Sequence, residues 1–201
     1  MKLVIASSSA GKLAELRALL GGSGIELVSQ RALGIDDAEE TGSTFIENAL
    51  LKARKAARES GLPALGDDSG LCVDALNGEP GLYSARYAGK HGDAEANIDK
   101  LLRQLDDVAD AQRSARFHCV LALLRHADDP QPIIAQGSWQ GRVLTARRGT
   151  QGFGYDPVFY DVEHQQTAAE MDAGLKNRIS HRGQALAALK AALDGRACNI
   201  S

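Results

Sequence analysis

Apolar positions along this chain follow two periods, and each period predicts one kind of element. Short apolar runs predict strands, at residues 2–6, 25–29, 63–66, 71–76, 115–125, 132–144 and 158–160. Leucine, isoleucine and alanine spaced three and four positions apart predict amphipathic helices, at residues 10–20, 44–60, 93–105 and 175–193. Because the strands and helices mix without strict strand-helix-strand alternation, the pattern favours an α/β or α+β fold with a mixed sheet.

Residues at the ends of the predicted helices support these boundaries. Thr44 and Glu47 have the spacing of a capping box, in which each side chain accepts a hydrogen bond from the other residue's backbone N–H. Gly21 and Gly22 follow the first helix and Gly195 follows the last, and glycine is the preferred residue just past a helix end. No repeat of fixed period and no low-complexity tract is present.

Length and composition predict one globular domain. The chain has 201 residues, of which 44% are hydrophobic and 24% are charged, as in ordinary globular proteins. We expect a single domain over residues 1–201, with two lobes around a long central mixed sheet and flanking helices. The 23 basic and 26 acidic side chains give a net charge of −3, which argues against a general nucleic-acid-binding protein.

Apolar runs and cysteines indicate the compartment. The longest apolar stretches, such as 120–124 and 133–135, are far shorter than the roughly 18 to 20 residues of a membrane-spanning helix. The first apolar run ends at Ser7, which is too early for a signal peptide, so we expect a cytoplasmic protein without a membrane partner. Cys72, Cys119 and Cys198 lie far apart, and they are expected to be free thiols.

The segment Ser7-Ser8-Ser9-Ala10-Gly11-Lys12 joins a predicted strand to a predicted helix. Hydroxyls, free backbone N–H groups and one ammonium therefore meet at the positive end of a helix, where phosphate binds readily. The segment is not a Walker A loop, because Ala6 stands at the place of its first glycine and Leu13 follows the lysine. A capped turn with a solvated lysine is the alternative interpretation.

Two adjacent carboxylates, Asp67 and Asp68, are expected in a turn between the predicted strands at 63–66 and 71–76. Mg²⁺ is commonly held by one or two carboxylates together with substrate phosphates, and Glu39, Glu40 and Asp74 are further candidate ligands. Adjacent acids in a turn more often simply face solvent. Because these two acids lie between two apolar strands, a catalytic role and simple exposure to solvent are equally favoured interpretations.

Two further segments could contact a ligand. His181 and Arg182, expected within the last helix, carry hydrogen-bond donors suited to carbonyl or phosphate oxygens, although a surface pair is the simpler interpretation. Phe153 lies between Gly152 and Gly154, which would let a ligand approach the backbone closely; a core phenylalanine in a turn is the alternative. The glycine spacing does not match a dinucleotide fingerprint, and no zinc-protease or serine-nucleophile motif is present.

Taken together, these segments resemble the family of non-canonical purine nucleoside triphosphate pyrophosphatases, also called inosine triphosphate pyrophosphatases. The match covers the chain from Leu3 to about Lys190. The six matching segments are 7–12, 38–49, 67–71, 80–86, 152–157 and 180–182.

The resemblance implies hydrolysis of ITP, dITP and XTP to the monophosphate and pyrophosphate, by attack of water at the α-phosphorus with Mg²⁺ as cofactor. It implies that Asp68 is the general base and that Glu40 and Asp68 serve the metal. The residues implied to contact the phosphates and the rest of the substrate are Ser7, Ser8, Ser9, Ala10, Gly11, Lys12, Lys52, Ser69 and Lys176. Those implied to hold the base are Phe153, Gly154, Tyr155, Asp156, His181 and Arg182.

The resemblance also implies a homodimer and a role in removing deaminated purine nucleotides from the nucleotide pool. Ser9 departs from the family, whose phosphate loop carries asparagine at this place. Two other functions stay open at this point. One is a pyrophosphatase of modified pyrimidine nucleotides, against which Phe153, His181 and Arg182 argue. The other is a regulator that binds a purine nucleotide without turnover, for which the paired acids would be superfluous.

Overall fold

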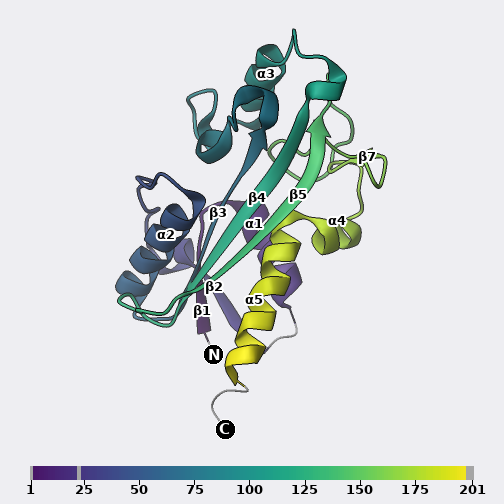
Figure 1. The fold of residues 1–201 in the computed structure, drawn as a ribbon. Helices are drawn as coiled ribbons and strands as arrows, with labels where there is room; N and C mark the ends of the chain where they lie inside the picture. Colours follow the sequence, from purple (N-terminus) through teal and green to yellow (C-terminus); the bar gives the residue numbers. More distant parts are fainter. Residues whose placement is uncertain (1, 22–23, 198–201) are drawn as a thin grey trace. The chain divides into compact units, whose positions relative to one another are not determined.

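Figure 1 shows the fold in a computed structural model, which describes residues 2–21 and 24–197. Seven strands form one sheet in the order β2-β1-β3-β4-β5-β6-β7. They are β1 (Lys2–Ala6), β2 (Glu26–Ser29), β3 (Ala64–Val73), β4 (Ser114–Leu124), β5 (Ile133–Val143), β6 (Phe159–Asp161) and β7 (Gln166–Thr167). The helices are α1 (Ala10–Leu20), α2 (Phe45–Ser60), α3 (Ala94–Gln104), α4 (Ala173–Ile179) and α5 (His181–Ala197), with short 3₁₀ turns at Gln30–Leu33, Asp74–Leu76, Gly81–Arg86 and Asp110–Gln112.

The pairing of the strands makes the sheet mixed. Strand β1 runs parallel to both β2 and β3, whereas β6 runs antiparallel to both β5 and β7. Parallel strands at one side of the sheet follow from the connections through α1 and α2, because a parallel pair needs a long crossover. The predicted α/β class with a mixed sheet is confirmed.

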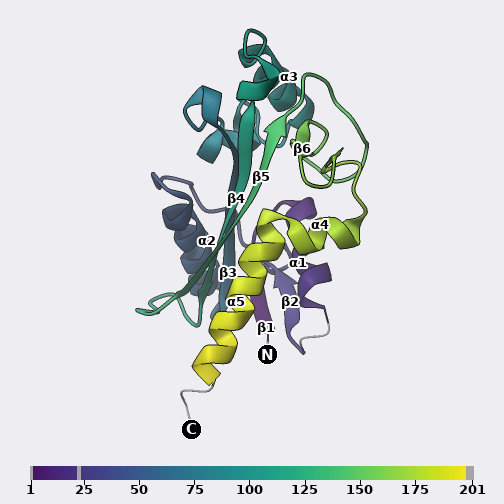
Figure 2. The ribbon, with the colours of Figure 1, turned by 45° about the vertical axis from the view of Figure 1, so that its right-hand side comes forward.

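The chain folds into two compact units, which we describe separately. Unit 1 contains residues 1–68, 119–137 and 182–201, and unit 2 contains residues 69–118 and 138–181. In unit 1, Figure 1 shows α2 and α5 on opposite sides of β1, and the turned view of Figure 2 brings α5 to the front. Leucines of α1 and α5 pack on one face of the strands, in a cluster with Leu3, Ile5 and Leu65. Alanines of α2 pack on the other face.

Unit 2 has an aromatic core. The ring of Phe117 lies 4.6 Å from that of Phe159 between centroids, and the rings of Trp139 and Phe159 are 4.9 Å apart. Leu101 of α3 and Met171 belong to the same buried cluster. In the described part of the chain, no helix combines the length and the apolarity that crossing a membrane requires.

Two sequence predictions about elements are wrong. The predicted turn at Asp67 and Asp68 lies inside the continuous strand β3, because cations on both faces of the sheet neutralise the two carboxylates. The predicted helix at 175–193 is two helices, α4 and α5, separated by Ser180 with an extended backbone (φ −65°, ψ 159°). Serine favours such a helix-boundary conformation, and the apolar spacing concealed this signal.

The remaining boundary predictions concern the ends of elements. Helix α1 ends before Gly21 as predicted, whereas Gly195, predicted to follow the last helix, lies within α5. Gly22 and Cys198 lie outside the described residues. Cys72 and Cys119 are free thiols, as predicted.

Candidate functional site

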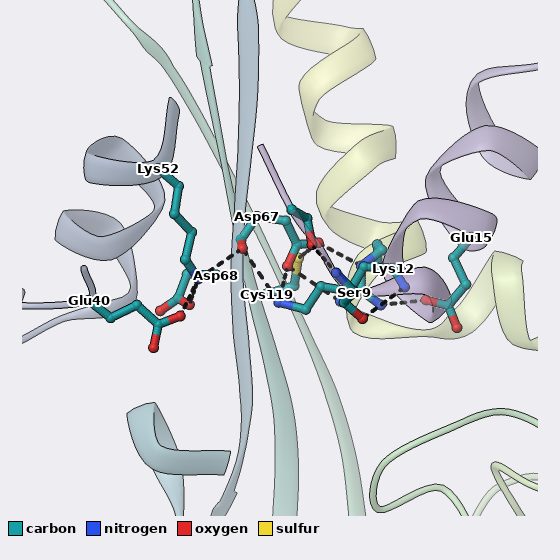
Figure 3. A network of polar contacts seen from close by, with 10 residues as sticks. Ser9, Lys12, Glu15, Glu40, Lys52, Asp67, Asp68 and Cys119 are labelled. Carbon is teal, nitrogen blue, oxygen red and sulfur yellow. Dashed lines mark hydrogen bonds and ion pairs between the residues drawn. The ribbon is translucent and has the colours of Figure 1, made fainter. Parts of the chain in front are cut away.

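The strand β3 distributes two adjacent carboxylates to opposite faces of the sheet. Successive side chains of a strand point to alternate faces, so Asp67 shares a face with Leu65, and Asp68 shares the other face with Gly66. Leu65 packs in the cluster formed by α1 and α5, whereas Gly66 lies against α2. Figure 3 shows the result: Lys52 and Glu40 lie on the side of Asp68, and Lys12 and Glu15 lie on the other side.

On the α2 face, one ammonium bridges two carboxylates. Lys52 Nζ lies 2.6 Å from Asp68 Oδ1 and 2.6 Å from Glu40 Oε1 (Figure 3). The predicted capping box is present: Thr44 Oγ1 accepts from the Glu47 N–H, and the Glu47 carboxylate accepts from the Thr44 N–H at 2.9 Å. This box fixes the start of the helix that carries Lys52.

Glycines and one buried amide bring this helix and its preceding loop close to the strand. A Cβ atom on Gly66 would lie only 2.1 Å from the Ala49 carbonyl oxygen, so α2 can approach β3 this closely only at a glycine. The buried Asn48 accepts a hydrogen bond from the Gly42 N–H at 2.8 Å, which ties the loop bearing Glu40 to α2.

Burial dominates the electrostatics of the Asp68 carboxyl. Burial raises the pKa of Asp68, and although Lys52 and Lys12 lower it, the net pKa lies above the usual value. Burial lowers the pKa of Lys52, but the two carboxylates beside it raise that pKa by more than burial lowers it. The net pKa lies above the usual value, so Lys52 stays charged. Asp68 Oδ2 is buried and has no hydrogen-bond partner among the described residues. A carboxylate oxygen of this kind is available to a water molecule, a metal ion or a substrate group.

On the opposite face, Asp67 is enclosed by cations. Asp67 Oδ1 lies 2.7 Å from Lys12 Nζ, and Asp67 Oδ2 accepts from Arg182 Nε at 2.6 Å. Arg182 also pairs with Glu15 of α1, and the Cys119 thiol lies 3.8 Å from Asp67 Oδ2. Burial raises the pKa of Asp67, but Arg182 and Lys12 outweigh it and hold that pKa well below the usual value. Asp67 is therefore an ionised carboxylate that contacts two cations.

The two lysines meet at one backbone oxygen. Lys12 Nζ and Lys52 Nζ each donate to the carbonyl oxygen of Asp67, at 3.4 Å in both cases. They reach it from α1 and α2, which lie on different faces of the strand. Two ammonium groups that meet at one carbonyl oxygen, next to a residue with a buried carboxylate (Asp68), form a place suited to a polyphosphate and to attack by water.

The predicted phosphate loop has the expected strand-to-helix context. Ser9 is the N-cap of α1, and its hydroxyl accepts from the Lys12 N–H at 3.4 Å. Ser7 Oγ in turn accepts from the Ser9 N–H at 3.2 Å. The first N–H groups of α1, including those of Ala10 and Gly11, are among those that a helix leaves without an intrahelical partner. Asparagine and serine are equally good N-caps, so the departure from the family at Ser9 preserves the cap.

In unit 2, Asp156 joins Phe153, which is expected to hold the base, to Lys176, which is expected to contact the phosphates or the rest of the substrate. Asp156 Oδ2 accepts from the Phe153 N–H at 2.8 Å and from Lys176 Nζ at 2.6 Å. Lys176 Nζ also lies 5.0 Å from the centroid of the partly exposed Phe153 ring. Gly152 has a φ of +78°, and a Cβ there would lie 2.0 Å from Asp156 Oδ2, so this turn requires glycine.

The other expected residues of unit 2 are His181, Tyr155 and Ser69. The buried His181 ring stacks on Phe117 with centroids 4.7 Å apart and an interplanar angle of 15°. Tyr155 donates its hydroxyl hydrogen to the Ser84 carbonyl oxygen at 2.9 Å. Ser69 lies within β3 and is half-buried.

Each unit therefore brings together its own part of the predicted set. Unit 1 joins Lys12, Lys52 and Asp68, and unit 2 joins Phe153 and Lys176 through Asp156. Sequence reasoning missed Glu15 and the separate surroundings of Asp67. The signals were present: Lys12 and Glu15 are three apart on one helix, and alternation along β3 separates the two aspartates.

A divalent cation fits the Asp68 side of β3. Mg²⁺ prefers carboxylate oxygens and usually keeps substrate phosphates among its ligands. Asp68 has an unbonded buried oxygen, and the Glu40 carboxylate shares Lys52 with it. Within the described ranges, no group of three or more His, Cys, Asp or Glu side chains is placed to hold a metal alone. The candidate Asp74 instead pairs with Arg116 at the surface. This donor set suits a cation that arrives with a phosphate.

Known proteins resemble this chain over nearly its whole length. A dITP/XTP pyrophosphatase of Xanthomonas campestris pv. campestris is 61% identical over 94% of this chain and 94% of its own. The dITP/XTP pyrophosphatase of Shigella flexneri is 56% identical, over 96% and 98% of the two chains. The structure of a HAM1 protein from Coxiella burnetii superposes with a TM-score of 0.88 at 50% identity, over 97% of this chain and 99% of that one. The Ham1 family model matches residues 3–192, and the chain belongs to the Ham1 family.

Proposed function

We propose that this protein is a nucleoside triphosphate pyrophosphatase that hydrolyses dITP, ITP and XTP to the monophosphate and pyrophosphate. Relatives that carry the name dITP/XTP pyrophosphatase are 56 to 61% identical to it over nearly the full chain. The single structural observation behind the proposal is the meeting of two ammonium groups at the Asp67 carbonyl oxygen, next to Asp68, whose buried carboxylate has one oxygen without a hydrogen-bond partner. Removal of these nucleotides from the pool follows as the biological role.

We assign the triphosphate to Ser7–Lys12, Lys52 and Ser69. Phosphoryl transfer requires mainly positioning and charge neutralisation from the protein. Lys12 and Lys52 supply two positive charges, and the N-terminus of α1 adds N–H donors and the positive end of a helix dipole. These groups neutralise the charge that develops on the phosphate oxygens.

Asp68 is the proposed general base. Its Oδ2 atom accepts the proton of the water that attacks the α-phosphorus, while Lys52 holds Oδ1. A raised pKa suits this role, because general bases work best with a pKa closer to the operating pH. Mg²⁺, held by Glu40 and Asp68 together with phosphate oxygens, would neutralise phosphate charge and polarise the bond to be broken.

The base is assigned to Phe153–Asp156, His181 and Arg182, and Lys176 is assigned a further contact with the substrate. The Phe153 ring offers a face for stacking, and Asp156 fixes it beside Lys176. Donors such as those of His181 and Arg182 would pair with the 6-keto oxygen of hypoxanthine or xanthine. Adenine presents an amino group there and would leave these donors unpaired, and such polar mismatches can discriminate by about 10⁴-fold.

Product analysis with dITP, dATP and dGTP in the presence of Mg²⁺ tests this function. We expect dIMP and pyrophosphate from dITP, with dATP and dGTP largely unchanged. Asp68→Asn should lower kcat by about 10²- to 10⁴-fold and retain dITP binding. Release of orthophosphate, or equal turnover of the three nucleotides, would contradict the proposal. Binding without turnover by the unmodified protein would instead support a regulator.

A homodimer and a cytoplasmic location complete the proposal, and both come from the family resemblance. Sedimentation equilibrium of the purified protein tests the dimer, which should give twice the 21.3 kDa chain mass. A monomer that retains full activity would remove the dimer from the proposal.

A further inference from the structure

Asp67 contacts a residue from each of two proposed recognition groups. Lys12, assigned to the triphosphate, lies 2.7 Å from Asp67 Oδ1. Arg182, assigned to the base, donates to Asp67 through Nε at 2.6 Å and through Nη2 at 3.4 Å. Asp67 is 1% exposed, and both of its carboxylate oxygens already contact a cation. Asp67 therefore acts on Lys12 and Arg182, its two cationic neighbours.

Glu15 adds a second carboxylate to the same network. It lies on α1 three residues after Lys12, and its carboxylate pairs with Arg182 Nη1. The network thus alternates in charge, from Glu15 through Arg182 and Asp67 to Lys12. Because the buried charges balance, each cation is held in place without an excess of negative charge that would compete with phosphate for Lys12. Bidentate and multiple contacts also fix the plane of the guanidinium.

We propose that Asp67 is a positioning residue that couples the two recognition groups, by holding the Lys12 ammonium for the phosphates and the Arg182 guanidinium for the base. The inference rests on the proposed function, because it takes the roles of Lys12 and Arg182 from it. Asp67 thus differs from its neighbour Asp68: it touches no reacting atom, and it acts through two other side chains.

The test compares Asp67→Asn with the unmodified protein in two measurements. The first is kcat/KM for dITP and for dATP, whose ratio reports base discrimination. The second is the affinity for inorganic tripolyphosphate, which has no base and reports the Lys12 group alone. We expect Asp67→Asn to weaken tripolyphosphate binding by about tenfold, as for loss of a charged hydrogen bond, and to lower the dITP to dATP ratio at least about tenfold. Lys12→Ala should weaken tripolyphosphate binding and leave the ratio unchanged.

Asp161→Asn is the matched control for the loss of a buried carboxylate. Asp161 is 4% exposed, accepts from the Trp139 indole at 2.6 Å in unit 2, and is not among the residues assigned to the phosphates or the base. We expect this variant to lose stability and to keep both the ratio and tripolyphosphate affinity. A similar fall of the ratio in Asp161→Asn would show that discrimination merely follows stability, and it would overturn the proposal. An unchanged ratio in Asp67→Asn would overturn it too.

Glu15→Gln keeps the proposal testable if Asp67→Asn does not fold. This variant neutralises the carboxylate that pairs with Arg182 Nη1 and leaves the contact between Asp67 and Lys12 in place. We expect a ratio lowered about threefold with unchanged tripolyphosphate affinity, and an unchanged ratio would refute the coupling. The proposed function fails separately, when the unmodified protein releases no pyrophosphate from dITP. The same variants are then compared by calorimetric binding of dITP, dATP and tripolyphosphate, with the same expected ratios.

Discussion

Replacing Gly66 by alanine tests whether the close approach of α2 to β3 positions Lys52, which we assign to the triphosphate. A Cβ at residue 66 would lie 2.1 Å from the Ala49 carbonyl oxygen, and ordinary contacts begin at 3.4 Å, so the helix backbone would have to retreat by about 1.3 Å. The obstacle is backbone, and Ala49 and Ala53 are fully buried, so no flexible side chain can yield instead. If α2 moved as a rigid body, the 2.6 Å separation between Lys52 Nζ and Asp68 Oδ1 would grow toward about 3.9 Å.

Two opposing effects determine the stability of this variant. Alanine restricts the unfolded chain, which favours folding by about 0.4 to 1 kcal/mol. Overpacking at a closely packed backbone costs about 1 to 3 kcal/mol, and here the required shift exceeds 1 Å. We therefore expect a net loss of about 2 kcal/mol. With a denaturant slope of about 2 kcal/mol per molar urea, the unfolding midpoint should fall by about 1 M.

Activity should fall together with stability, and more steeply. Displacement of a reacting group by about 1 Å can lower the rate about 10²-fold, so we expect kcat for dITP to fall by about 10- to 100-fold under conditions where the variant is folded. Gly21→Ala is the matched control, because its Cβ would lie 3.2 Å from the Arg17 carbonyl oxygen and 3.6 Å from that of Ala18, at a residue with φ of −55°. An unchanged midpoint and an unchanged kcat in Gly66→Ala would refute this account of the site.

Three further predictions concern the cap, the metal and pH. Thr44→Ala removes the capping box of α2 and should lower the free energy of unfolding by about 1 kcal/mol, as measured by urea unfolding; a change below about 0.3 kcal/mol would contradict the cap assignment. Chelation with EDTA should abolish pyrophosphate release and leave the thermal melt unchanged, and Mg²⁺ should restore activity; full activity in EDTA would remove the metal from the proposal. Burial raises the pKa of Asp161, but hydrogen bonds from His164 and Trp139 outweigh it and hold the pKa below its usual 3.8. Its contribution to stability is therefore complete above pH 3.8 and is lost as the pH falls below that value. The fluorescence of Trp139, the single tryptophan, should report less loss of stability below pH 4 in Asp161→Asn than in the unmodified protein.

Most of the fold could be predicted, because in most elements the local sequence pattern and the tertiary packing favour the same structure. The stripe of alanines on α2 and the apolar run of β1 each predict the face that the structure buries. The capping residue Thr44 likewise marks the start of its helix. These features depend on neighbouring residues alone, which a sequence displays directly.

The sequence predicted less where distant partners decide the conformation. Asp67 and Asp68 have low intrinsic strand propensity, and they lie within β3 because cations from α1, α2 and α5 neutralise them. The break at Ser180 was hidden for a similar reason, since apolar spacing continues across it. Arg182 could be singled out from its motif, but its two carboxylate partners lie 115 and 167 residues away in the chain. No local pattern carries such pairings.

The alternation of side chains along β3 also determines which mutations the site can tolerate. Asp67 and Asp68 have chemically identical side chains, yet Asp67 lies on the α1 and α5 face and Asp68 lies on the α2 face. A substitution at one position therefore leaves the packing of the opposite layer intact. Insertion of a single residue before Asp67 would instead exchange the faces of both carboxylates, since the side-chain period of a strand is two. The site should thus tolerate separate substitutions on either face and fail with any shift of one residue along this strand.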